Sequence, residues 1–401
     1  MENQFELSKE QLVEIANGLT EKILLGLKKE NTEVQCIPTF ITPSKNYKKG
    51  KATVFDLGGT NFRAATVEIG ENEVKILEQE KKNFEEMKRE GFTKENLYDA
   101  ILSVSEKLKL NENTNIGYCY SFPSKSLPNG DGEFVSWSKG INIPNMNEEP
   151  IGQSLVKYIN AHSKKNYGKV VVLNDTITAL FAGLSNKGYD AYIGLIVGTG
   201  TNMATFFPKK AVEKLGTSVS GVEEKLPINF ESGNFYPKYL TKFDDIVDKK
   251  SNNPGQQCFE KAVSGMYVGK IFREVFSQDN LPENMDGGSL GEILLHPEKY
   301  STEYVETAYN IYVRSAKLVA SSIVGVVKAI QTFSPDIKSV MLLAEGSMFW
   351  SNEGYKDAVY SSWVEKSIQE LSPLMQLEGV CIKIGKMEHA NLIGAALSVL
   401  S

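Results

Sequence analysis

A turn containing glycine and threonine occurs twice in this chain, each time between two runs of apolar residues. The first copy, residues 54–61, reads VFDLGGTN, and the second copy, residues 196–202, reads IVGTGTN. Glycine lets the backbone approach an anion closely and tolerates positive φ angles. Threonine adds a hydroxyl, and exposed backbone amides in such a turn can bind a phosphate. Two copies therefore predict two phosphate-binding turns that hold a nucleotide's phosphate tail between two halves of one protein.

The length of 401 residues exceeds what one compact core usually accommodates, so two domains are expected. The apolar fraction of 41% and the charged fraction of 23% are typical of a globular protein. The formal net charge of -6 argues against nucleic acid as the main partner, because nucleic-acid-binding proteins concentrate positive charge. An acidic protein that binds a polyanion needs local donors, glycine-rich backbone and a metal ion.

The four cysteines are scattered, and with only three histidines they form no spacing typical of a zinc site. We expect reduced structural thiols in a reducing compartment. The N-terminus lacks the basic start and apolar core of a signal peptide. No stretch reaches the roughly 20 apolar residues of a membrane span. A soluble, cytoplasmic protein without a membrane partner is expected.

Hydrophobic periodicity indicates helices and strands that alternate along the chain, which predicts an α/β fold with mixed sheets. Two strand–turn–strand units are expected at residues 51–77 and 191–207, and a polar, loop-rich stretch at 227–258. Further strands are expected at 116–122, 170–173, 339–343 and 380–384. Helices are expected at 8–29, 93–109, 150–165, 175–184, 258–276, 302–332 and 391–400.

Two common phosphate-binding motifs are absent from the sequence. The nearest approach to a P-loop, residues 265–271, is one residue short, lacks the hydroxyl and lies in a helical pattern. A Rossmann fingerprint beginning at Gly198 fails because Met203 occupies the position of its last glycine. The phosphate site is therefore expected to be of the strand–turn–strand kind.

Three charged residues near strand ends are candidates for the chemistry. Asp56, beside the first glycines, either orients Mg²⁺ through water or stabilises the turn. Arg63 either contacts a phosphate or forms a surface ion pair. Asp175 follows a four-residue apolar strand, where it either accepts a proton from an attacking hydroxyl or caps the next helix.

Several loops between the strands carry hydroxyls, amides and carboxylates. Such groups suit a polyol, because one carboxylate can accept hydrogen bonds from two neighbouring hydroxyls. A site of this kind strongly rejects analogues that lack a hydroxyl. The loops are residues 121–123, 138–140, 228–231 and 255–261.

These segments, in this order and over nearly the whole chain, resemble the hexokinases of the actin-like ATPase superfamily. Residues 254–261 (PGQQCFEK), with SGMYVG behind them, make the resemblance highly specific. The other matching segments are residues 55–63, 121–123, 138–140, 173–176, 198–202, 228–233, 344–347 and 394–396.

The resemblance implies phosphorylation of the 6-hydroxyl of glucose or a related hexose by ATP with Mg²⁺, with Asp175 as general base and Lys139 stabilising charge on the phosphoryl group. It places these residues against the sugar: Ser121, Phe122, Pro123, Ser138, Lys139, Asn174, Asp175, Asn202, Glu231 and Glu260. It places these residues against the nucleotide or, for Asp56, the metal: Asp56, Gly58, Gly59, Thr60, Asn61, Arg63, Gly198, Thr199, Gly200, Gly346 and Ser347.

The resemblance also implies two actin-like (ribonuclease H-like) lobes, each with a mixed five-stranded sheet flanked by helices, and a cleft between them. The small lobe is predicted to comprise residues 48–173 and 386–401, and the large lobe residues 1–47 and 174–385. The protein is expected to be a monomer or a homodimer with a hexose substrate.

Three departures from the family pattern stand out. Ser138 replaces the usual threonine, and Glu345 replaces the usual aspartate, which adds a methylene beside the base pocket. Residues 388–391 (EHAN) replace the usual Asp-Gly-Ser-Gly-like run, which leaves the C-terminal hinge contact open. A catalytically silent hexose sensor on the same fold is the alternative interpretation.

Overall fold

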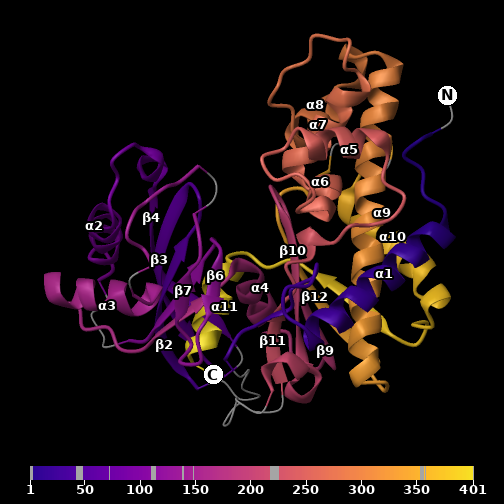
Figure 1. The fold of residues 1–401 in the computed structure, drawn as a ribbon. Coiled ribbons are helices and arrows are strands. Elements are labelled where there is room, and N and C mark those ends of the chain that lie inside the picture. Colours follow the sequence, from indigo (N-terminus) through magenta and orange to yellow (C-terminus); the bar gives the residue numbers. More distant parts are fainter. Residues whose placement is uncertain are drawn as a thin grey trace.

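Two β-sheets with one shared strand order organise the computed structural model of the chain (Figure 1). The structure describes residues 3–41, 48–71, 73–109, 114–137, 140–147, 149–216, 225–352, 356 and 358–400. Both sheets mix parallel and antiparallel strands and are flanked by helices, which confirms the predicted α/β class.

The first sheet has the strand order β4-β3-β2-β5-β8. The three strands β2, β3 and β4 pair antiparallel, whereas β5 and β8 continue the sheet in parallel from β2. Its strands are β2 (Gly50–Leu57), β3 (Asn61–Ile69), β4 (Val74–Asn83), β5 (Ile116–Tyr120) and β8 (Val170–Leu173).

The second sheet repeats this plan in the order β11-β10-β9-β12-β13, with the same pairing directions. A sixth strand, absent from the five-stranded prediction, arises because a two-residue segment pairs with the free edge of β11. The strands are β1 (Ile37–Pro38), β9 (Ala191–Val197), β10 (Thr201–Pro208), β11 (Lys225–Asn229), β12 (Ser339–Glu345) and β13 (Cys381–Gly385). The doubled turn is thus the first hairpin of each sheet.

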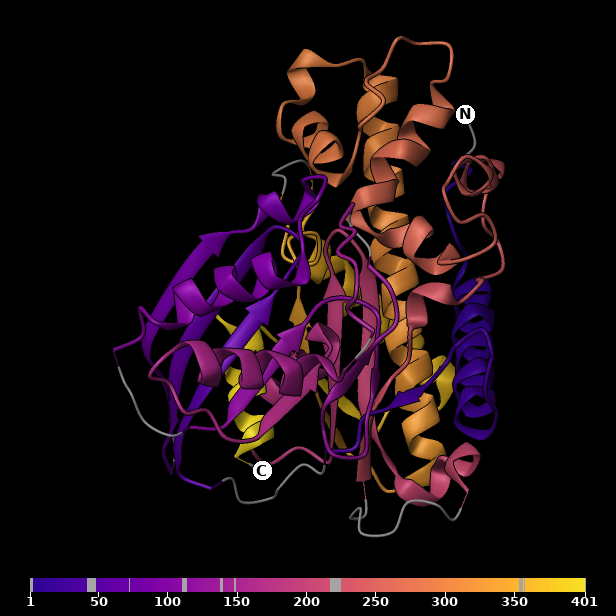
Figure 2. The ribbon, with the colours of Figure 1, turned by 60° about the vertical axis from the view of Figure 1, so that its left-hand side comes forward.

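Two helices lie between the sheets (Figures 1 and 2). α4 (Asp175–Gly183) packs on the second sheet, α11 (Ala390–Val399) packs on the first, and the two helices contact each other. The core between them contains Val54 and Leu173 from the first sheet, Ala204 from the second and Leu180 and Leu392 from the two helices. The helix pair therefore joins the two sheets.

The remaining helices cover the outer faces. α2 (Lys94–Ser105) and α3 (Ile151–His162) pack on the first sheet, and α9 (Thr302–Phe333) packs on the second with α1 (Lys9–Lys28) and α10 (Tyr360–Leu371) beside it. Four shorter helices gather around one end of α9 (Figure 1): α5 (Lys242–Lys249), α6 (Cys258–Val263), α7 (Gly265–Val275) and α8 (Gly287–Leu295). A two-stranded sheet comprises β6 (Ser124–Ser126) and β7 (Gly132–Phe134). Among the described residues, no helix is both long and apolar enough to cross a bilayer.

The sequence pattern gave most elements within a few residues of their observed bounds, but it missed three helices. α5 and the last residues of strand β11 lie inside the stretch 227–258 that we predicted to be loop-rich, and α8 and α10 were not predicted. One helix was predicted at 258–276, but the chain breaks at Ser264, which is extended. The break occurs because the Gly265 amide donates to the Gly198 carbonyl at 2.7 Å, on the second glycine turn.

A buried ion pair fastens α5 to α9. Arg314 donates two hydrogen bonds to the Asp244 carboxylate, at 2.7 and 2.8 Å, and both side chains are buried. The Arg314 guanidinium also lies 5.0 Å from the centre of the Phe5 ring. Burial alone would raise the pKa of Asp244, but the Arg314 charge and hydrogen bonds from Arg314 and Thr241 hold that pKa below its ordinary value.

We predict that Asp244→Asn lowers the free energy of unfolding by about 3 kcal/mol at neutral pH, because Arg314 then stays buried without a counter-charge. The native contribution is fully present above the unfolded-chain pKa of about 3.9 and is lost as pH falls through the depressed folded pKa. Urea titrations should therefore show the difference shrinking from about pH 5 to about pH 3. Asp336→Asn, at an exposed turn, is the control; equal stability of Asp244→Asn and wild type at neutral pH would contradict the role of the pair.

Candidate active site

The residues predicted for the site lie where parallel strands of both sheets end. In the first sheet these are the ends of β2, β5 and β8, followed by the segments at 58–61, 121–123 and 174–176. In the second sheet they are the ends of β9 and β12, followed by 198–200 and 346–347. Ligands of α/β sheets characteristically bind at the carboxyl ends of strands. The topology therefore supports one site built from both sheets.

Two neighbouring residues after the end of β8 take different roles: one caps the next helix, and the other is the proposed catalytic residue. Asn174 is the N-cap of α4, and its side-chain oxygen accepts from the Thr176 amide at 2.8 Å. Asp175 is the first helical residue, and its Oδ1 accepts from the same amide at 2.8 Å. Its Oδ2 accepts no hydrogen bond from the described residues. This oxygen is free to accept a proton or hydrogen bond from a substrate.

Asp56 and Arg63, predicted for metal and phosphate, pair with each other. They lie directly opposite on β2 and β3, and Arg63 donates to Asp56 Oδ2 through Nε at 2.8 Å and also through Nη2. Asp56 is buried, whereas the Arg63 side chain is 28% exposed. Glu345, at the end of β12, lies within electrostatic reach of Arg63; burial raises the pKa of Glu345 to about 7, although Arg63 and Lys386 lower it.

The first glycine turn leaves backbone donors available. The Gly58 amide closes the hairpin onto the Asn61 carbonyl at 3.0 Å, and the Thr60 carbonyl accepts from Phe84 at 2.7 Å. The amides of Gly59 and Thr60 have no hydrogen-bond partner in the described part of the chain. Two neighbouring free amides beside an arginine fit the oxygens of a phosphate.

The second glycine turn is held by a neighbouring helix and a neighbouring strand end. The carbonyls of Gly198 and Thr199 accept from the first two amides of α7, at 2.7 and 3.3 Å. Gly198 also lies against Gly346: a Cβ at Gly198 would lie 3.4 Å from the Gly346 Cα. Gly346 has φ +111, and a Cβ there would lie 2.2 Å from the Val197 carbonyl oxygen. Only glycine fits at Gly346, so the ends of β9 and β12 stay in contact.

Glu260 reaches the second turn from α6. Its Oε2 accepts from the Thr201 amide at 3.0 Å. A Cβ at Gly200 would lie only 2.5 Å from the same oxygen. The glycine is thus required for the carboxylate to occupy its observed position.

A chain of side-chain hydrogen bonds connects Asn202 with Glu231. Asn202 donates to Asn229 Oδ1 at 2.7 Å, and Asn229 donates to Glu231 Oε1 at 2.7 Å. Burial raises the pKa of Glu231, the Asn229 bond lowers it, and the nearby charge of Asp175 raises it. Among the predicted sugar ligands, Asn202 and Glu231 are thus joined through Asn229, and Asp175 lies within electrostatic reach of Glu231.

The predicted sugar loop is only partly described. The Ser121 amide donates to the Leu57 carbonyl at 3.1 Å, which places it beside the end of β2. The Phe122 ring is buried and packs edge-on against Trp137 at 4.8 Å, so its side chain belongs to the core, while Pro123 is exposed. Ser138 and Lys139 lie outside the described residues.

Sequence reasoning missed residues that hold the ligands in place. Asn229 lies in the predicted sugar segment 228–233, and sequence reasoning assigned it no role, although a polar residue at the end of an apolar segment is a recognisable signal. The buried Lys261 bonds Asp248 at 2.7 Å and the Asn253 carbonyl at 2.9 Å. Asp248 also accepts from the Gly255 amide at 2.9 Å. This clamp fixes the loop that leads into α6 and Glu260.

The residues present fit a nucleotide with a water-bound magnesium ion better than a directly bound metal. Among the described residues, no group of three or more His, Cys, Asp or Glu side chains is placed to hold a metal. Asp56 is already paired with Arg63. Mg²⁺ characteristically keeps several waters and uses few carboxylates. A contact to Asp56 through water is compatible with this arrangement.

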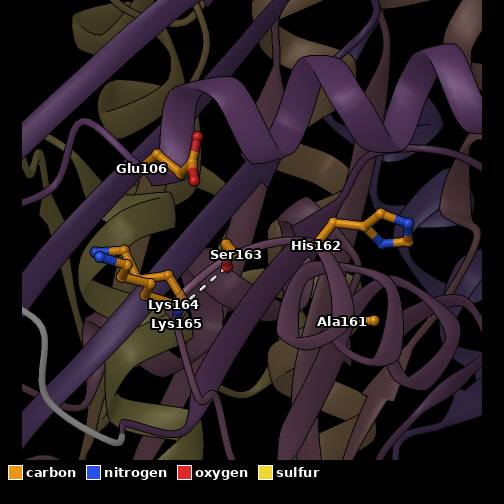
Figure 3. Close-up of a pocket in the computed structure, with 6 residues that line it drawn as sticks. All are labelled: Glu106, Ala161, His162, Ser163, Lys164 and Lys165. Atoms are coloured by element: carbon orange, nitrogen blue, oxygen red, sulfur yellow. Dashed lines mark hydrogen bonds between the residues drawn. The ribbon is translucent and has the colours of Figure 1, made fainter.

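A surface pocket lies apart from these residues, where α2 and α3 end (Figure 3). Its lysines are partly engaged: Lys165 Nζ donates to the Leu108 carbonyl at 2.8 Å, and its amide to Ser163 Oγ at 3.1 Å. None of the predicted site residues lines it; the lining residues are Glu106, Ala161, His162, Ser163, Lys164 and Lys165.

Two similar mixed sheets, each opened by a glycine hairpin and joined through a pair of central helices, define the class of two-lobed α/β proteins with an actin-like fold. Residues 1–184 and residues 192–309 match two family models, both described as hexokinase. The chain belongs to the hexokinase family.

Individual relatives agree with this membership. Hexokinase-3 of Mus musculus is 31% identical over 285 residues, which cover 68% of this chain and 30% of that protein. Hexokinase-9 of Oryza sativa subsp. japonica is 27% identical over 451 residues, covering 98% and 87%. A glucose-complexed hexokinase from Schistosoma mansoni shares the fold, with a TM-score of 0.79 and 23% identity over 99% of this chain and 96% of that one. The match spans less than a third of the length of the mouse relative.

Cys119 lies near the carboxyl end of β5, within the first sheet. It lies on β5, directly beside Asp56 of β2 in the register, and is fully buried. Burial raises the pKa of its thiol well above the ordinary value, and the charges of Asp56 and Asp175 raise it further. Burial also raises the pKa of Cys36 to about 12, although Lys214 opposes this, whereas Cys381 is exposed.

We predict that one thiol of the folded chain reacts rapidly with a disulfide reagent such as DTNB and that the three buried thiols react only after denaturant is added. The thiolate is the reactive form, so a buried thiol with a raised pKa is inert. Cys381→Ser should abolish the rapid phase. A rapid phase that persists in this variant and disappears in Cys119→Ser would contradict the prediction.

Proposed function

We propose that this chain transfers the γ-phosphoryl group of ATP to the 6-hydroxyl of glucose or a related hexose, giving hexose 6-phosphate and ADP. The observation that carries the proposal is Asp175 at the end of β8, with one carboxylate oxygen unused by the described residues and Glu231 nearby. Membership in the hexokinase family and the glucose named for the Schistosoma mansoni structure support the same substrate class.

In the proposed reaction, the sugar hydroxyl oxygen forms a bond to the γ-phosphorus while the bond to the ADP oxygen breaks. Asp175 accepts the hydroxyl proton through Oδ2, and the chain Asn202–Asn229–Glu231 and Glu260 orient the remaining hydroxyls. The free amides of the first turn and Arg63 bind phosphate oxygens, and Thr199 and Ser347 contribute hydroxyls. Bound Mg²⁺ supplies charge neutralisation on the phosphates, which is the main requirement of phosphoryl transfer.

Closure of two lobes is part of this proposal. The small lobe comprises residues 48–173 and 386–401, and the large lobe residues 1–47 and 174–385. Sugar ligands from both lobes would meet only when the site is filled, which keeps water from replacing the sugar. Lys139, in the sugar loop, would stabilise charge on the phosphoryl group.

The decisive experiment is a coupled assay of ADP release across glucose, mannose, fructose, glucosamine and N-acetylglucosamine. Sugar-dependent ADP release supports the proposal. Binding of a hexose, seen as a change in tryptophan fluorescence, with no ADP release would instead favour a catalytically silent sensor. ATP turnover without sugar would contradict both interpretations.

We predict that Asp175→Ala lowers kcat by about 10²–10⁴-fold, the usual contribution of a positioned general base. Hexose binding, followed by tryptophan fluorescence, should weaken but persist, because the other ligands remain. Asp336→Ala, at an exposed aspartate before the amino end of β12, should keep wild-type turnover, because the proposed site lies at the carboxyl ends of the strands. Near-normal turnover of Asp175→Ala would remove the base from the mechanism.

We also predict that Gly200→Ala raises the KM for the hexose by about tenfold, because a misplacement of the order of 1 Å at a positioned group is costly. The added methyl would displace the Glu260 carboxylate, which lies 2.5 Å from that point. Gly379→Ala is the matched control, since a Cβ there meets nothing within 4 Å. An unchanged hexose KM in Gly200→Ala would exclude Glu260 as a sugar ligand.

A further inference from the structure

The hydroxyl of Thr178 lies where the two central helices touch, one turn beyond Asp175. Its Oγ1 lies 2.6 Å from the carbonyl oxygen of Asp175 and 3.0 Å from Oδ1 of Asn391, the second residue of α11. It also lies 3.7 Å from the Cys119 sulfur on β5. Thr178 is fully buried, so water does not compete for these contacts.

A threonine hydroxyl has one proton, yet two acceptors lie within hydrogen-bond distance. One acceptor, the Asp175 carbonyl, belongs to the same helix. The other, Asn391, belongs to the helix that packs on the first sheet. Rotation of the hydroxyl redirects its hydrogen bond from one acceptor to the other, and the donor stays satisfied in both positions. A contact across the two sheets can therefore be made or released without leaving a buried donor unpaired, which would cost far more than the bond itself.

The backbones of α4 and α11 are in direct contact beside the Thr178 hydroxyl. A Cβ at Gly394 of α11 would lie 1.8 Å from the Thr178 carbonyl oxygen, so the two backbones touch here. A movement of one sheet relative to the other would therefore change the distance between Thr178 and Asn391, which lie beside this contact. Cys119, whose sulfur lies 3.7 Å from the same hydroxyl, is directly opposite Asp56 in the register of β5 and β2.

We infer that the Thr178 hydroxyl alternates between two acceptors, the Asp175 carbonyl and Asn391, at the hinge, which is the contact of α4 with α11. This exchange positions Asp175 and couples α4 to movement of the first sheet. Both are positioning residues: they act through the first turn of α4 and do not touch the reacting atoms. The inference rests on the proposed phosphotransferase activity for its kinetic readout.

A double-mutant cycle in the 401-residue chain tests the inference. Thr178→Val and Asn391→Ala are each expected to lower kcat about fivefold, the effect of losing one ordinary hydrogen bond, with the KM for ATP unchanged within about twofold. The double variant should lose about fivefold rather than the product of the two effects, because both substitutions remove the same contact. Thr178→Ser, which keeps the hydroxyl, and Asn391→Asp, which keeps the acceptor, should restore most of the turnover.

Two measurements distinguish a positioning role of Thr178 and Asn391 from two other outcomes, a variant that fails to fold and a protein that lacks the proposed activity. Thr332→Val removes a hydroxyl bonded only within its own helix and should leave kcat unchanged. Hydrogen exchange of the amides of 175–181 should accelerate in Asn391→Ala even when no hexose is turned over. Unaltered exchange, or independent effects that multiply in the double variant, would overturn the inference. Absence of turnover in the wild type, with accelerated exchange in Asn391→Ala, would refute the proposed function alone and uphold the hinge contact.

Discussion

The close contact of α4 with α11 is the constraint on which the rest of the structure depends. It requires glycine at 394, where a side chain would enter the Thr178 backbone, and at 117, where a Cβ would lie 2.1 Å from the Ala395 carbonyl oxygen. These two glycines let α11 lie flat on β5 and against α4 at once. Because α4 begins where β8 ends, its position also fixes Asp175 relative to the second sheet. The packing of one helix pair thus directs the strand ends of both sheets into one region.

The two copies of the glycine turn have become unequal. The first carries an ion pair on its flanking strands and keeps two free amides, which suits a phosphate. The second uses its carbonyls to hold α7 and gives its Thr201 amide to Glu260, while Asn202 faces Asn229. A turn whose polar groups form hydrogen bonds within the protein is rigid, and a rigid turn suits the positioning of sugar ligands. The two similar turn sequences therefore indicate where the site lies. Their different surroundings distinguish the proposed phosphate side, at the first turn, from the proposed sugar side, at the second turn.

Local patterns predicted the parts that local physics determines. The hairpins and the buried strand at 170–173 depend on neighbouring residues, and each was predicted. α5 and α10 were not, because short, strongly charged or weakly patterned helices depend on what they pack against. The same limit applies to the site. The Thr178–Asn391 contact joins residues 213 positions apart, and no spacing in the sequence indicates it. The sequence left the role of Arg63 undecided between a phosphate contact and an ion pair, and the register of β2 and β3 places Asp56 opposite it.

The register of β2 and β3 also helps to explain how an acidic protein could bind a polyphosphate. Asp56 and Glu345 both lie near Arg63, but only Asp56 is held opposite it by a strand ladder, so Asp56 receives the two hydrogen bonds. Glu345 comes from the other sheet, and burial raises its pKa to about 7. Near neutral pH a substantial fraction of Glu345 is therefore uncharged, while the charge of Asp56 is balanced by its partner. Two carboxylates at the proposed nucleotide side thus present far less negative charge than their number implies, and the net charge of -6 need not oppose ATP at the place where its phosphates would bind.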